Sequence, residues 1–107
     1  MDIDGITKGK WKVISLSGRF DAQTSKKVEE ALTNQLVINN NFIALDLSNI
    51  KYMSSAGLRV LLSMRKALKE KNGNLVLINP QENVMEVLEL SGFSKIFFIL
   101  NSIEGLT

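Results

Sequence analysis

A nearly continuous apolar run, Phe-Ile-Ala-Leu-Asp-Leu, occupies residues 42–47 between two groups of polar turn residues. A strand with one face in water alternates apolar and polar residues, whereas a strand covered on both faces reads as a run of this kind. Strands covered on both faces belong mainly to parallel sheets that carry helices. The run therefore predicts a buried central strand, ending near Asp46 and Leu47, in a domain of the α/β class.

Strand and helix patterns alternate on both sides of this run. Gly9 lies in a turn that joins the first two strands as an antiparallel hairpin, and the later strand–helix–strand units are right-handed crossovers between parallel strands. The expected fold is a small mixed β-sheet with helices packed on it, formed by a single domain over residues 1–107. Strands are expected at residues 3–7, 11–16, 42–47, 75–78 and 96–100, helices at 25–37, 55–71 and 81–90, and a final helical turn at 102–106.

Several finer expectations follow from the same patterns. Gly18 and the residues after it should break the second strand, and residues 48–54 should form a loop whose Tyr52 and Met53 turn inward. The second helix should bury one apolar face, and the aromatic residues should belong to the core. That face is expected to hold Leu58, Leu61, Leu62, Met64 and Leu68, and the core aromatics are expected to be Trp11, Phe97 and Phe98.

The chain contains no His and no Cys. It therefore cannot form a disulfide, a thiolate zinc site or the usual His-dependent hydrolase site. We expect no metal and no cofactor, and the composition agrees with a binding protein that is not an enzyme, although it does not by itself exclude other enzymatic activities. A net charge of +2 with mixed signs indicates neither a nucleic-acid nor a membrane-surface protein. The acidic first residues lack a signal-peptide pattern and the apolar runs are too short to cross a bilayer, so a cytoplasmic protein is expected.

The segment that leads from the apolar run into the second helix contains the candidate site. The unpaired N–H groups at a helix start, with the positive end of the helix dipole behind them, suit an anion such as phosphate. Ser54 and Ser55 place two hydroxyls there, and Arg59 follows one turn later. The common alternative is that these serines only cap the helix, as Asp21 or Thr24 can cap the first helix. Gly57 indicates close packing or an approaching partner.

The same segment carries a family resemblance. Residues 46–58 read Asp-Leu-Ser-Asn-Ile-Lys-Tyr-Met-Ser-Ser-Ala-Gly-Leu, which resembles the signature of the STAS domain, named for sulfate transporters and anti-sigma-factor antagonists. Residues 18–21, Gly-Arg-Phe-Asp, resemble the shorter second motif of that family, and residues 75–97 resemble its later strand–helix–strand. The resemblance covers nearly the whole chain and agrees with the order of elements.

The resemblance implies an anti-sigma-factor antagonist, a binding protein in a partner switch. Its partner would be an anti-sigma factor that is a serine kinase, and a PP2C-type phosphatase would reverse the phosphorylation. Alignment on Met53 and Gly57 makes Ser55 the modified residue, with Ser54 as the alternative acceptor. We expect the protein to be a monomer or weak homodimer. The partner contact would include Asp21, Thr24, Ser54, Ala56, Gly57 and Arg59.

Two other functions remain open from the sequence. One is an unphosphorylated scaffold or regulatory STAS subunit of a larger signalling or transport complex. The other is a nucleotide-binding or weakly hydrolytic protein, although the chain has neither a Gly-x-x-x-x-Gly-Lys-Ser/Thr loop nor a Gly-x-Gly-x-x-Gly motif.

Overall fold

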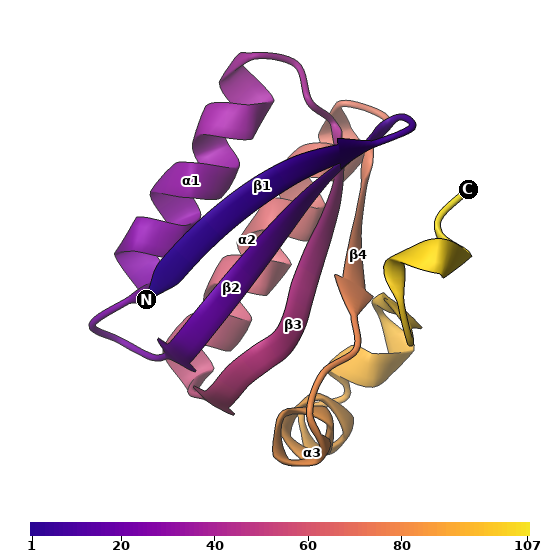
Figure 1. Ribbon diagram of the computed structural model, residues 1–107. Helices are drawn as coiled ribbons and strands as arrows, with labels where there is room; N and C mark the ends of the chain where they lie inside the picture. The colour runs from indigo at the N-terminus through magenta and orange to yellow at the C-terminus, as the bar shows by residue number, and fades with distance from the viewer.

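A five-stranded sheet in the order β1-β2-β3-β4-β5 runs through the computed structural model, which describes residues 1–107 (Figure 1). β1 pairs with β2 antiparallel, and every later pair is parallel. The predicted fold class is therefore confirmed. The strands are β1 (Asp2–Lys8), β2 (Trp11–Phe20), β3 (Phe42–Met53), β4 (Asn74–Ile78) and β5 (Phe98–Leu100), and the helices are α1 (Ser25–Val37), α2 (Ser55–Glu70) and α3 (Glu82–Leu90).

The two faces of the sheet are covered unequally. α1 and α2 lie on one face, behind the sheet in Figure 1, and α3 packs at the end of the sheet near β3. The main core of 20 buried residues lies between the sheet and the helices. A smaller cluster on the other face holds Trp11, Val13, Ala44, Val76 and Ile78, against which Ile103 and Leu106 of the C-terminal segment pack. β3 is thus covered on both faces, as its apolar run predicted.

The central strand is longer than the sequence predicted. β3 does not end at Asp46 but continues to Met53, so the expected loop over residues 48–54 is wrong. β4 ends opposite Asp46, which leaves the second half of β3 without a neighbour on that side. Side chains at the start of α3 replace that neighbour, because Gln81 Nε2 donates to Ser48 O at 2.9 Å and Asn83 Nδ2 donates to Lys51 O at 2.7 Å.

β2 also continues past the point where the sequence predicted a break. Gly18 adopts a φ of 120°, a conformation that L side chains rarely take, and the register with β3 shifts on both sides of it. The strand therefore bends at Gly18 and ends at Phe20, which is fully buried.

Three side chains face the solvent where the sequence placed them inside. Leu62 is 42% exposed, because α2 instead buries Gly57, Val60, Leu61, Met64 and Leu68. Tyr52 is 40% exposed, while its neighbour Met53 is buried as predicted. Phe98 is 65% exposed on the edge strand β5, and only Phe97 enters the core. β5 begins at Phe98 and not at residue 96. No helix has the length and apolar character needed to cross a membrane.

Candidate functional site

The carboxyl ends of β2 and β3 bring the two sequence motifs together. Phe20 O, at the end of β2, accepts a hydrogen bond from Ser54 N at 3.0 Å, which ties the start of α2 to the segment around Asp21. Gly57 makes this approach possible, because a Cβ added there would lie 2.9 Å from Phe20 O and 3.2 Å from Met53 Cγ. The structure thus gives buried Gly57 a packing role beneath the surface.

The two neighbouring serines differ in accessibility. Ser54 is the N-cap residue of α2, yet its Oγ is buried and has no hydrogen-bond partner. Ser55 is the first residue of the helix and is exposed to solvent. The predicted position of Ser55 at a helix start is confirmed. Of the two hydroxyls, only that of Ser55 belongs to an exposed residue.

Asp21 and Thr24 hold the turn that precedes α1. Asp21 Oδ1 accepts hydrogen bonds from Gln23 N at 3.0 Å and Thr24 N at 3.3 Å, both of which precede the first residue of α1. Thr24 is the N-cap residue of α1 but makes no side-chain capping bond, so these two side chains hold the turn and, contrary to the sequence prediction, do not cap the helix. Thr24 Oγ1 donates to Arg19 O at 2.7 Å, which fastens the turn to the end of β2. Desolvation alone would raise the pKa of Asp21, but the backbone donors of Gln23 and Thr24, with Arg19 and the Thr24 hydroxyl, bring that pKa below its ordinary value.

Arg19 and Tyr52 join this site, although neither was among the contacts expected from the sequence. They are paired residues of β2 and β3, and the Arg19 guanidinium carbon lies 4.3 Å from the centre of the Tyr52 ring. Arg19 Nε also lies 3.5 Å from Asp21 Oδ2. Arg19 stands at the variable position of the shorter motif and Tyr52 is one of the matching residues of the longer one, and the pairing of β2 with β3 is what brings the two side chains together.

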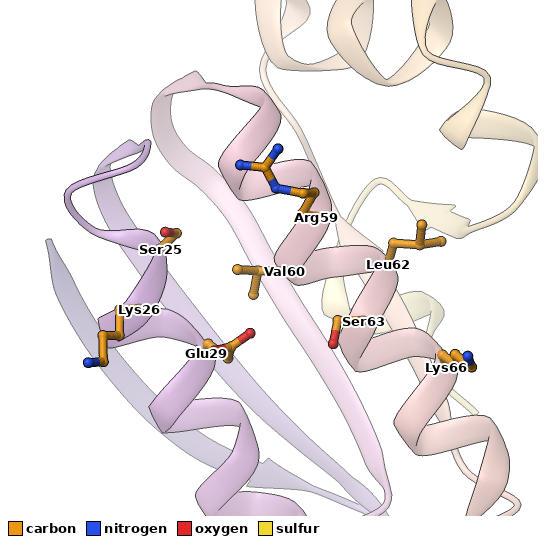
Figure 2. Close-up of a pocket in the computed structure, with 8 residues that line it drawn as sticks. All are labelled: Ser25, Lys26, Glu29, Arg59, Val60, Leu62, Ser63 and Lys66. Atoms are coloured by element: carbon orange, nitrogen blue, oxygen red, sulfur yellow. The ribbon is translucent and has the colours of Figure 1, made fainter.

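Ala56 is half-buried and Arg59 is exposed on the outer face of α2. Arg59 lies at the mouth of a groove of about 730 Å³ between α1 and α2 (Figure 2). The groove is lined by Ser25, Lys26, Glu29, Arg59, Val60, Leu62, Ser63 and Lys66. No group of three or more carboxylates gathers closely enough to hold a metal ion.

These features define a small mixed α/β domain that presents an exposed serine at a helix start, beside the carboxyl ends of its two central strands. The STAS domain model matches residues 3–105, and the chain belongs to the STAS domain family.

Two relatives cover most of the chain. A candidate anti-sigma factor antagonist of Bordetella bronchiseptica, BtrV, is 38% identical over 93 residues, which are 87% of this chain and 80% of the relative. The anti-sigma-B factor antagonist of Listeria monocytogenes is 35% identical over 92 residues, 86% of this chain and 80% of the relative.

Solved structures agree with the fold. The anti-sigma factor antagonist SpoIIAA in its unphosphorylated form superposes with a TM-score of 0.83 at 19% identity, covering 96% of this chain and 90% of SpoIIAA. The phosphorylated form of the same Bacillus protein gives a TM-score of 0.75 at 18% identity, covering 96% of this chain and 94% of that protein.

Proposed function

We propose that this protein is an anti-sigma-factor antagonist that binds an anti-sigma factor through the surface around Ser55. Membership in the STAS family and the two relatives named as antagonists support this function. The contact surface consists of Asp21, Thr24, Ser54, Ser55, Ala56 and Arg59, with Gly57 supporting it from below. The protein acts as a binding partner in the cytoplasm and has no catalytic role of its own.

We further propose that Ser55 is the switch of this interaction. The observation that carries this step is the exposure of Ser55 beside the buried hydroxyl of Ser54, since a kinase must reach the hydroxyl that it modifies. The partner anti-sigma factor is then a serine kinase that phosphorylates Ser55, and a PP2C-type phosphatase restores the unmodified form. That SpoIIAA has been solved with and without phosphate supports the same scheme.

The physical effect of the phosphate is local to the interface. A phosphate adds about −1.5 to −2 charges at neutral pH. At a helix start the dipole favours an anion by about 0.3–1 kcal/mol, so the fold accepts the group. A partner that covers Ser55 would have to remove water from this charge, and that desolvation is costly unless a counter-charge is supplied. Phosphorylation therefore prevents binding without unfolding the domain.

The test uses each serine-kinase anti-sigma factor encoded in the genome from which the chain comes, purified and mixed with ATP. We expect one of them to bind the unmodified protein in calorimetry and to add one phosphate, mapped by mass spectrometry to Ser55. Ser55→Ala should bind and resist the kinase, whereas Ser55→Asp should lose binding. Ser54→Ala is the matched control and should still be phosphorylated.

Phosphate found only on Ser54, or a Ser55→Asp variant that binds as tightly as the unmodified protein, would contradict the switch. Binding without any phosphorylation would instead favour a scaffold or regulatory subunit.

A further inference from the structure

The positive charge of the molecule is concentrated on α2. This helix contains Arg59, Arg65, Lys66 and Lys69 but only one acidic residue, Glu70, which gives it a net charge of +3. The whole chain carries +2, so the residues outside α2 carry a net charge of −1. A surface that is basic on one helix and slightly acidic elsewhere favours an acidic partner at that helix.

Five exposed residues form one continuous stripe on α2. They lie at alternating spacings of four and three residues, which places them on one side of a helix. Every one of them is exposed to solvent. This α2 stripe consists of Ser55, Arg59, Leu62, Lys66 and Lys69.

Leu62 is the apolar centre of the α2 stripe. It lies between two hollows, the groove of about 730 Å³ toward α1 and a second hollow of about 560 Å³ that Arg65, Lys66, Lys69 and Glu70 also line. Figure 2 shows Leu62 between Arg59 and Lys66 along the outer side of α2, with Lys26 and Glu29 on α1 across the groove. An exposed leucine with a hollow on each side and cations above and below it can anchor an amphipathic segment.

We propose that the α2 stripe docks an acidic amphipathic helix of the anti-sigma factor, with an apolar side chain of that helix against Leu62 and carboxylates facing Arg59, Lys66 and Lys69. This inference rests on the proposed function and extends its contact about four turns beyond Ser55, as far as Lys69. The spacing of four and three residues is the one with which two helices pack side by side at a small angle. Charge complementarity identifies the partner segment as acidic.

The same arrangement explains how one phosphate can disrupt a long contact. Ser55 and Arg59 are one turn apart on the same face, so a phosphate on Ser55 pairs with the first cation of the stripe. Arg59 is then no longer available to a carboxylate of the partner. The added negative charge also repels the acidic helix, because it stands at the end of the surface along which that helix lies.

An anionic membrane or a nucleic acid is a weaker match for this surface. Glu29 and Glu70 interrupt the basic surface, and the remainder of the chain is slightly negative. A polyanion binds best where many cations act together without acidic neighbours. Binding to an anionic membrane and binding to a nucleic acid are therefore measured as alternatives in the experiment below.

The experiment measures binding of the purified anti-sigma factor to four folded variants. Leu62→Ala and Lys66→Glu change the α2 stripe, while Leu90→Ala and Lys95→Glu make the same changes at exposed positions on α3 and on the short 3-10 helix Phe93–Lys95. We expect Kd to rise about tenfold for each stripe variant, as for an interface residue worth more than about 1 kcal/mol. The controls should stay within about twofold. The effect of Lys66→Glu should shrink as salt rises, and that of Leu62→Ala should not.

The outcomes separate this inference from the proposed function. If no anti-sigma factor binds the unmodified protein, both are wrong. If Ser55→Asp loses binding while Leu62→Ala and Lys66→Glu bind normally, the function stands and the docking helix is excluded. Two other results would overturn the assignment of a protein partner. One is sedimentation of the protein with vesicles rich in anionic phosphatidylglycerol, and the other is binding to duplex DNA, provided that Lys66→Glu abolishes the effect.

Discussion

Ser54 and Ser55 are neighbours with the same hydroxyl group, yet the start of α2 gives them different environments. The backbone N–H of Ser54 is bound to Phe20 O, and this contact turns the Ser54 side chain into the protein. Ser55 follows on the first turn and remains in solvent. Accessibility therefore distinguishes the two serines that we consider as phosphate acceptors, a difference that two identical residues in a sequence cannot reveal.

At Gly57, a single added methyl group should weaken the fold. Gly57→Ala would gain up to about 1 kcal/mol of helix propensity. The new Cβ, however, would lie 2.9 Å from Phe20 O, a backbone atom fixed by its bond to Ser54 N. Overpacking of this kind costs about 1–3 kcal/mol, so we expect a net loss in the free energy of unfolding, measured by urea melts. Ser63→Ala on the same helix should change stability by less than about 0.5 kcal/mol. A more stable Gly57→Ala would contradict the packing role.

Asp21 should make stability depend on pH in the acid range. Because its pKa is lowered in the folded state, the ionised carboxylate stabilises the fold above the unfolded pKa of about 4. That contribution is lost as pH falls through the folded pKa. Asp21→Asn keeps an acceptor oxygen but removes the charge, so it should melt at a lower temperature at pH 7. The difference from the natural protein should begin to shrink as pH falls below about 4 and should disappear only once the pH is below the lowered folded pKa. An Asp4→Asn control, at an exposed position on β1, should show no such pattern, and a gap independent of pH would exclude this role.

Among the elements, α2 shows where a sequence pattern reaches its limit. Its apolar residues nearly surround the helix, and adjacent Leu61 and Leu62 are equally good candidates for the core. The rotation of α2 about its own axis is set by its contact with α1 and the sheet, which buries Val60 and Leu61 and leaves Leu62 in the groove. The sequence therefore predicted the helix and its start correctly, but the buried face that it predicted is turned away from the one that the structure shows.

The two leucines should consequently differ in their effect on stability. Leu61→Ala removes a fully buried side chain and should lower the free energy of unfolding by about 2–5 kcal/mol. Leu62→Ala truncates a side chain that is 42% exposed and should cost less than about 1 kcal/mol. Urea melts of both variants check this. Equal losses in the free energy of unfolding would mean that Leu62 is buried, as the sequence predicted.

β3 shows a different limit, set by irregular pairing. From Ser15 to Phe20, β2 advances five residues while β3 advances seven, from Asp46 to Met53. The buried residues Leu47, Ile50 and Met53 are thus three apart, a spacing that does not match the alternation of a regular strand. The sequence predicted the regular half of β3 and missed the bulged half, because the extra residues follow from the partner strand.

For the whole molecule, phosphorylation at Ser55 should change charge far more than stability. One phosphate brings the net charge from +2 to near zero. Since the group stands at an exposed helix start, we expect the melting temperature to shift by no more than a few degrees, equivalent to about 1 kcal/mol. Thermal melts beside cation-exchange elution check both statements, and a phosphorylated form that unfolds at room temperature would contradict them.

Trp11 lies at the opposite end of β2 from the edge that carries Ser55. It begins β2 on the face of the sheet opposite α1 and α2, is only 7% exposed, and is the chain's one tryptophan. β2 then runs ten residues, roughly 30 Å, before it reaches the edge beside α2. Tryptophan fluorescence of this protein, excited where Tyr52 does not absorb, is therefore a signal from a single buried site. This emission should change when the sheet unfolds but not when a partner binds at the end that carries Ser55. Folding and partner binding can therefore be recorded separately without adding a dye.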